Sequence, residues 1–126
     1  MEAFSECIDL KNIIFNEGLV EIAEDAFAEC YNIEELYFPD SLTHILKSAF
    51  EGCVKLKKIS LPKNISTIRF FAFESCTQLQ EIEFRGTVEE WKDIRDNTNK
   101  LMIASNAFPK HIKKIKCLDG EVELRW

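Results

Sequence analysis

The chain has 126 residues, of which 46% are hydrophobic and 30% charged, and its net charge is -6. This composition predicts a folded domain rather than a disordered chain. Acidic and basic residues are interspersed, so we expect no nucleic-acid partner. No apolar run reaches the roughly 18 residues of a membrane span, and the N-terminus lacks the pattern of a signal peptide.

A sequence repeat with a period of 23 residues begins in the first residues of the chain. Copies start at Ala3, Ala26, Ala49 and Ala72, and they follow the template A-F-x-x-C-x-x-L-x-x-I-x-[FL]-P. A fixed period of this length is typical of a solenoid, in which each unit packs on its neighbours. Because Met1 falls within a repeat, we expect upstream repeats in a longer parent protein.

Each full unit, at about residues 17–38, 39–61 and 62–84, contains two strand-like segments. The first follows L-x-x-I, at residues 19–22, 42–45 and 65–68, and the second L-x-x-I-x-[FL], at 33–38, 56–61 and 79–84. The intervening A-F-x-x-C is too short for a stable helix and predicts a tight turn or a 3₁₀ turn. Pro39 and Pro62 should end the second strand, because proline cannot donate to a ladder.

Stacked units would place equivalent residues about 4.8 Å apart in parallel strands, so that each template position becomes a column. The Ala, Phe, Cys, Leu and Ile positions and the terminal Phe or Leu are predicted to point inward. We therefore expect residues 1–84 to form a repeat solenoid.

The template breaks after Phe84, and residues 85–126 are predicted to form a C-terminal cap. Thr87 and Glu90 have the spacing of a capping box, which indicates a helix at about residues 87–96. Val88, Trp91 and Ile94 share one face of that helix and should cover the open end of the last repeat.

A degenerate half-repeat and a hairpin are predicted at about residues 107–126, after a polar loop at 96–100. Ala107, Phe108, Ile112, Ile115 and Cys117 resemble repeat positions. Asp119-Gly120 is a two-residue turn signal, which would fold residues 121–124 back on residues 115–118.

The repeat template resembles the BspA-like (Treponema pallidum-type) leucine-rich repeats. Gly86-Thr87-x-x-x-Trp91 and Cys117-x-Asp119-Gly120 resemble a terminal segment of such proteins. The resemblance implies an α/β leucine-rich-repeat solenoid with short parallel strands and no catalytic residues. It also implies a repeat class common on secreted or surface-exposed bacterial proteins, some of which bind host proteins or other cells. The family usually has Ile-Gly before Ala-Phe, whereas this chain has Ala23, Leu46 and Arg69 at the second position.

Four cysteines recur at one template position: Cys7, Cys30, Cys53 and Cys76. In a solenoid they would lie in a line about 15 Å long, whereas tetrahedral zinc needs every sulfur about 2.3 Å from one point. Adjacent disulfides satisfy the Cα distance, but side chains in one column point the same way. We therefore predict buried free thiols, a packed Cys117 outside the column, and no metal or cofactor.

Neither histidine is paired with a nucleophile by any recognisable motif, and we predict no catalytic residues. His44 falls at an outward position of its predicted strand. A remote alternative is an enzyme with a site at the C-terminal cap, which would require polar groups to converge near Trp91, His111 and Asp119.

The outer face of the second set of strands is the predicted protein-binding surface. Its candidate residues form two columns: Ile14, Tyr37, Ser60 and Glu83, and Asn12, Glu35, Lys58 and Glu81. Phe70 and Phe71 form a second patch, of which at least one ring should point outward. We expect a non-catalytic protein-interaction module of the bacterial surface-adhesion type; the alternative is an intracellular scaffold. An exposed strand edge at residues 1–20 predicts self-association.

Overall fold

The computed structural model describes residues 11, 13–96, 103–104 and 106–124, without the side chains of residues 95 and 96. The predictions for Phe4, Cys7 and Asn12 lie outside these residues, as does most of the segment predicted to self-associate. Among the described residues, no helix is both long and apolar enough to cross a membrane.

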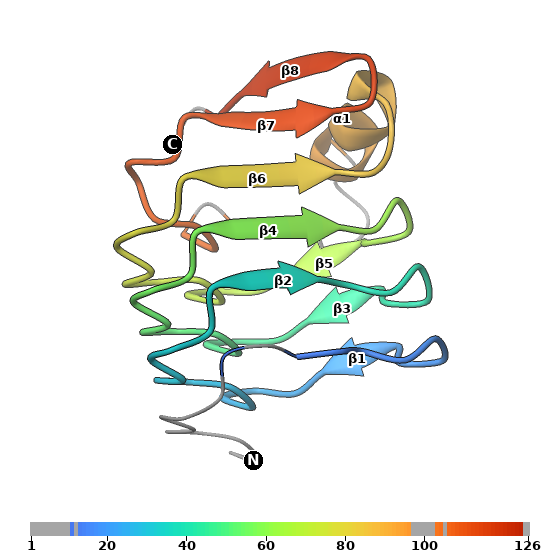
Figure 1. Cartoon of the computed structure of the whole chain (residues 1–126). Coiled ribbons are helices and arrows are strands. Elements are labelled where there is room, and N and C mark those ends of the chain that lie inside the picture. The colour runs from blue at the N-terminus through green and yellow to red at the C-terminus, as the bar shows by residue number, and fades with distance from the viewer. Residues whose placement is uncertain (1–10, 12, 97–102, 105, 125–126) are drawn as a thin grey trace.

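The strands form two sheets, and they stack in the order of the repeats (Figure 1). A three-stranded parallel sheet contains β1 (Glu21–Ile22), β3 (His44–Ile45) and β5 (Thr67–Ile68). A five-stranded sheet has the order β2 (Glu35–Tyr37), β4 (Lys58–Leu61), β6 (Glu81–Phe84), β7 (Lys114–Cys117) and β8 (Gly120–Glu123). All its pairs are parallel except β7–β8. Residues 23 apart pair directly, as in Leu36, Ile59 and Ile82, so the repeat period sets the register.

The predicted inward columns form the core. Phe27, Phe50, Phe73 and Phe108 are all buried, and successive ring centroids lie 5.1, 5.4 and 5.6 Å apart with nearly parallel planes. Phe108 therefore continues the phenylalanine column, as expected for a degenerate repeat. Each ring is covered on both sides only where a neighbouring repeat is present, so burial depends on stacking.

The Ala-Phe segments form tight turns and not 3₁₀ helices in the described repeats. The turns run through left-handed backbone conformations, with φ of 59° at Asp25, 57° at Ser48 and 60° at Phe71. Asp tolerates this conformation well, whereas a bulky side chain such as that of Phe71 adopts it at a cost. Backbone bonds between neighbouring repeats, such as Phe50 N–H to the Ala72 carbonyl at 2.8 Å, join the turns into a stack.

Helix α1 (Val88–Asp96) begins at the predicted capping box. The Thr87 N–H donates to Glu90 Oε1 at 2.8 Å, and the Glu90 N–H donates to Thr87 Oγ1 at 3.1 Å. The bond from the Thr87 N–H also lowers the pKa of the Glu90 carboxyl. Trp91 is fully buried and packs edge-on against Phe84, with ring centroids 5.2 Å apart. The helix thus lies against the end of β6.

The hairpin turn lies one residue earlier than the sequence signal indicated. Cys117 pairs with Gly120, so the two loop residues are Leu118 and Asp119, and Gly120 is the first residue of β8. Asp119 Oδ1 accepts a bond of 2.9 Å from the Val88 N–H at the start of α1. The side chain that suggested the turn is therefore used to hold the helix, which explains the shift.

Candidate protein-binding face

Outward residues of the five-stranded sheet form one continuous surface, which we call the outer face. They are Glu35 and Tyr37 of β2, Lys58 and Ser60 of β4, Glu81 and Glu83 of β6, Lys114 and Lys116 of β7, and Glu121 and Glu123 of β8. The intervening residues, such as Leu36 and Ile59, are buried, as the period-2 alternation of strands requires.

The most apolar part of this face lies at the β2 end. Ile14 is 89% exposed and Tyr37 is 63% exposed. The Glu34 N–H donates to the Lys11 carbonyl, and the Phe15 ring packs 5.4 Å from the Phe38 ring, so the segment with Ile14 runs beside β2. Of the predicted binding residues, these two are thus placed as large exposed side chains in neighbouring rungs.

The third residue of that column, Ser60, is covered by two other side chains. Ser60 faces outward but is only 2% exposed. Its hydroxyl donates to Glu83 Oε1 at 2.7 Å and accepts from Arg85 Nη1 at 2.8 Å. Both side chains lie over Ser60, and its role as a contact residue stays a prediction.

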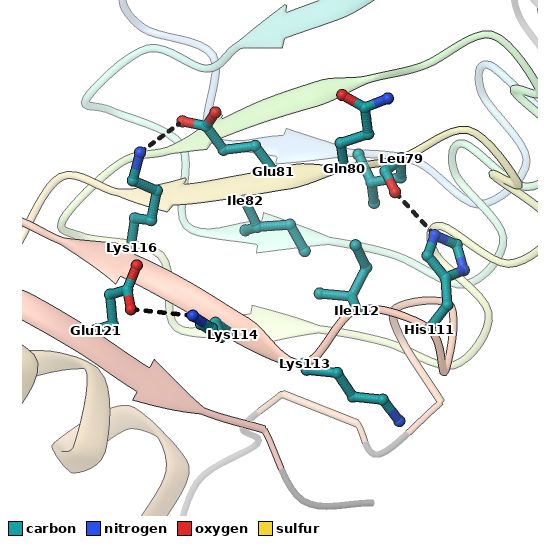
Figure 2. Close-up of a pocket in the computed structure, with 10 residues that line it drawn as sticks. All are labelled: Leu79, Gln80, Glu81, Ile82, His111, Ile112, Lys113, Lys114, Lys116 and Glu121. Atoms are coloured by element: carbon teal, nitrogen blue, oxygen red, sulfur yellow. Dashed lines mark hydrogen bonds and ion pairs between the residues drawn. The ribbon is translucent and has the colours of Figure 1, made fainter.

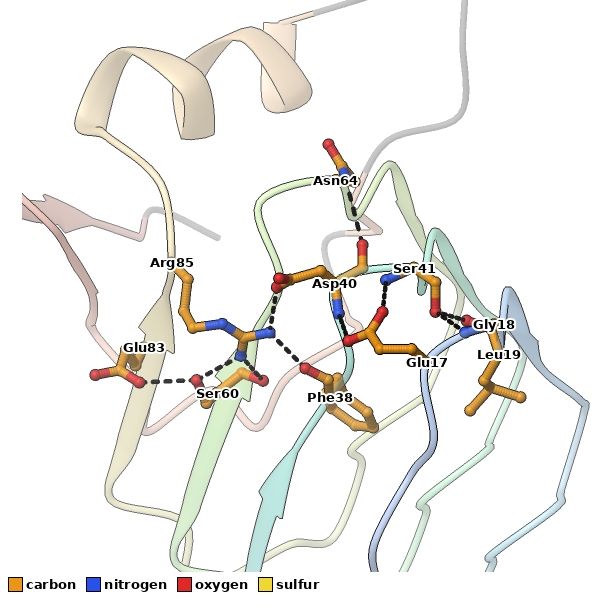
Figure 3. Close-up of polar contacts among 10 residues, drawn as sticks. All are labelled: Glu17, Gly18, Leu19, Phe38, Asp40, Ser41, Ser60, Asn64, Glu83 and Arg85. Carbon is orange, nitrogen blue, oxygen red and sulfur yellow. Dashed lines mark hydrogen bonds and ion pairs between the residues drawn. The ribbon is translucent and has the colours of Figure 1, made fainter.

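Arg85 was not among the predicted site residues, and it organises this end of the face (Figure 3). Its guanidinium donates to the Ser60 and Phe38 carbonyls, and it pairs with Asp40 at 3.1 Å. The Arg85 Cζ lies 4.0 Å from the centroid of the Tyr37 ring, which places the cation over the aromatic face. The available signal was the template itself, since Arg85 stands where the two preceding copies have proline.

A polar network extends from Arg85 along the ends of the strands (Figure 3). The N–H groups of Asp40 and Ser41 donate to the Glu17 carboxylate at 3.0 and 3.2 Å. Asn64 Nδ2 donates to the Asp40 carbonyl at 3.3 Å. Four successive turns of the chain are therefore joined by side chains as well as by backbone bonds.

The second predicted column carries charges of alternating sign. Glu35, Lys58 and Glu81 are direct register partners in β2, β4 and β6. Glu81 lies 3.9 Å from Lys58 and 3.6 Å from Lys116, and Lys114 lies 3.4 Å from Glu121. This part of the face is largely neutralised by its own ion pairs, in contrast to the apolar β2 end.

The cysteine column is buried, as predicted. Cys30, Cys53 and Cys76 are fully buried, Cys53 and Cys76 are free thiols, and Cys117 is a free, partly buried thiol. The Cys53 thiol donates to the Phe27 carbonyl at 3.3 Å, and burial raises its pKa to about 12. Burial also raises the pKa of Cys76 and Cys117. In the described part of the chain, no three His, Cys, Asp or Glu residues are grouped so as to hold a metal ion.

The three residues required by the enzyme hypothesis do not converge. Trp91 is buried on the side of α1 that packs on Phe84, Asp119 binds the Val88 N–H, and His111 Nε2 lies 2.8 Å from the Leu79 carbonyl. His111 lines a surface pocket that neither of the other two lines. The second histidine, His44, is partly exposed and bonds through Nδ1 to Thr43 Oγ1 at 2.6 Å.

Phe70 and Phe71 are both exposed, with ring centroids 6.5 Å apart. The guanidinium of Arg69 lies 5.9 Å from the Phe70 ring. The pair belongs to the turn after β5 and is separate from the outer face.

Parallel strands in 23-residue register and stacked apolar columns define a leucine-rich-repeat fold. The family model described as "BspA type leucine rich repeat region" matches residues 1–118 in six copies, and the chain belongs to this family. The match extends past residue 84, where the sequence predicts that the repeats end and the C-terminal cap begins. The division into solenoid and cap at that residue stays a prediction.

A solved structure of a leucine-rich cell surface protein from Faecalibacterium prausnitzii A2-165 is similar to this chain. The two are 36% identical, with a TM-score of 0.70 over 73% of this chain. The similar region spans 24% of the Faecalibacterium chain. The search of curated proteins found no match.

Proposed function

We propose that this chain is a non-catalytic protein-interaction module of a bacterial cell-surface or secreted protein, and that it binds its partner through the β2 end of the outer face. The leucine-rich-repeat family supports interaction with a protein. The cell-surface description of the similar Faecalibacterium protein supports the location. In the same proposal, residues 1–84 form a solenoid and residues 85–126 its cap, supported by the packing of Trp91 on Phe84.

The observation that carries the proposal is the Tyr37 ring, which is exposed on one side and held by Arg85 on the other. An exposed tyrosine normally loses conformational freedom on binding, which weakens the complex. Here Arg85 is itself fixed by Ser60 and the Phe38 carbonyl, so the ring is already positioned. Aromatic residues held in this way are frequent hot spots of protein interfaces.

Site-specific photo-crosslinking tests the proposal. A photoreactive phenylalanine replaces Tyr37 in one variant and Tyr31 in a matched control; Tyr31 is also exposed but lies on the turn before β2. Both variants are irradiated with surface proteins of host cells and, separately, with bacterial cytosolic proteins. We expect a discrete adduct from the surface proteins at position 37 and none at position 31.

Equal adducts at both positions, or none at position 37, would contradict a binding role for this end of the face. A discrete adduct with cytosolic proteins alone would instead support the intracellular scaffold. An Arg85→Ala background should weaken the adduct, because it frees the ring.

A further inference from the structure

A pocket of about 490 Å³ lies beside the first residues of β6 and β7 (Figure 2). The paired residues Glu83 and Lys116 are 33 positions apart in the sequence, compared with 23 in the preceding strand pairs. This one position is the whole of the β6–β7 register, whereas β4 and β6 pair at four positions. In the described residues, the chain before β7 therefore has no register partner at the start of β6, and the pocket lies there.

The pocket has polar walls and lies over residues of the buried core. Leu79, Ile82 and Ile112 belong to the buried core and line the pocket. Two of the wall lysines are already neutralised, Lys114 by Glu121 and Lys116 by Glu81 (Figure 2). A volume of this size is within the usual range for a small-molecule or side-chain site.

Three polar groups of the wall have no partner among the described residues: the Lys113 ammonium, the Gln80 amide and Nδ1 of His111. The Leu79 carbonyl can only accept, so His111 Nε2 must carry the proton of that bond, which fixes the orientation of the ring. The Lys113 ammonium supplies donors only, and the Gln80 amide supplies two donors together with one acceptor oxygen. The unsatisfied wall groups are therefore mainly donors, and one of them is a cation.

The local charge differs in sign from that of the whole protein. Residues 97–118 contain five lysines and no acidic residue, in a chain whose net charge is -6. The pocket wall contains three lysines and two glutamates, which leaves an excess positive charge. The lining contains no arginine or helix N-terminus, the groups that most often hold phosphate.

We propose that this pocket binds a carboxylate of the protein partner, an acidic side chain or a chain terminus. Lys113 and Gln80 would donate to the carboxylate. The proposal adds a ligand class to the outer face, and it rests on the proposed function only in taking the partner to be a protein.

Small carboxylates test the pocket without the partner. The backbone amide signals of the full chain are followed by NMR during titration with N-acetyl-leucine, which has a terminal carboxylate, and N-acetyl-glutamic acid α-amide, which has a side-chain carboxylate. N-acetyl-leucinamide is the uncharged control. We expect saturable shifts around Ile82, Ile112 and Lys113 with at least one carboxylate, and about tenfold weaker binding of the amide. The better of the two carboxylates identifies the source.

Lys113→Gln should weaken the carboxylate about fivefold. Lys47→Gln is the matched control, because it removes the same charge from an exposed lysine on the turn after β3, which belongs to the other sheet. Equal binding of acid and amide, equal loss in both variants, or no saturable shift would overturn the proposal. Tyr37→Ala should leave carboxylate binding unchanged, so failure of the β2-end interface and failure of the pocket give different results.

Discussion

Along β2, β4 and β6, the inward residues Leu36, Ile59 and Ile82 are similar aliphatic side chains in one register. Their outward neighbours Tyr37, Ser60 and Glu83 are an aromatic ring, a hydroxyl and a carboxylate. Inside, each copy therefore makes the same contacts as the previous one. Outside, each copy makes contacts of its own, and a single residue such as Arg85 reaches across several copies. The repeated positions thus supply the stability of the fold, and the variable positions supply the contacts that differ from one copy to the next.

The largest expected effect comes from breaking an inward column. Phe50→Ala should lower the free energy of unfolding by about 3–5 kcal/mol, because the Phe50 ring is stacked between Phe27 and Phe73. Urea unfolding followed by circular dichroism measures the loss. Phe70→Ala removes an exposed ring of the same size and should cost less than about 1 kcal/mol. Similar losses in the two variants would contradict the distinction between inward and outward positions.

Arg85→Ala should have the next largest effect. It removes the donors to the Ser60 and Phe38 carbonyls, and its loss should destabilise the chain by about 1–3 kcal/mol. Arg69→Ala is the control, because the described contact of the Arg69 guanidinium is with the exposed Phe70 ring. If both variants unfold at the same urea concentration, Arg85 does not hold the copies together.

Alkaline pH should lower the free energy of unfolding through the buried Cys53 thiol, which belongs to the interior. Burial raises the pKa of Cys53 to about 12 from the ordinary value of 9.0. Between these values the unfolded chain loses a proton that the folded chain keeps, so this contribution is complete below pH 9 and is lost as the pH rises towards 12. The loss should be on the order of 1 kcal/mol at pH 10.

Urea unfolding at pH 8 and pH 10 measures this loss, and a Cys53→Ala variant provides the control. The variant should begin less stable, but its decrease between the two pH values should be smaller than that of the unmodified chain. An identical decrease would show that Cys53 is not responsible.

The charged part of the outer face should contribute least. In a double-mutant cycle, Lys58→Ala and Glu81→Ala should show a coupling energy of about 0.2–1 kcal/mol, because the pair is exposed and 3.9 Å apart. Raising the salt concentration should reduce it. A coupling above about 2 kcal/mol would place these charges among the stabilising elements of the fold.

The interior could be predicted from the sequence because the same apolar residue types recur at the same template positions in every copy. One template position gives the environment of every copy, and Phe27, Phe50 and Phe73 are buried as that logic requires. The capping box of Thr87 and Glu90 was also predictable, since both partners lie within one helical turn.

The outer face was less predictable because its contacts depend on side-chain reach. Ser60 points outward as expected, but the pattern does not say that Arg85, 25 residues later, covers it. The hairpin turn was misplaced by one residue because Asp119 has a partner, Val88, that is 31 residues away. The pocket beside β6 lies where the connection to the next strand is longer than in the preceding repeats, and the sequence shows the added length but not the pocket.

The reach of Arg85 makes the number of repeats matter. A phenylalanine column has the same geometry at any length, so duplication or deletion of a 23-residue unit would leave its stacking intact. Arg85, however, contacts Ser60 one rung away and Phe38 two rungs away. Deleting residues 39–61 would bring the neighbouring rungs together with Tyr37 in the place of Ser60, and it would remove Asp40. The core can therefore gain or lose whole units, whereas the Arg85 network depends on the particular order of the units in this chain.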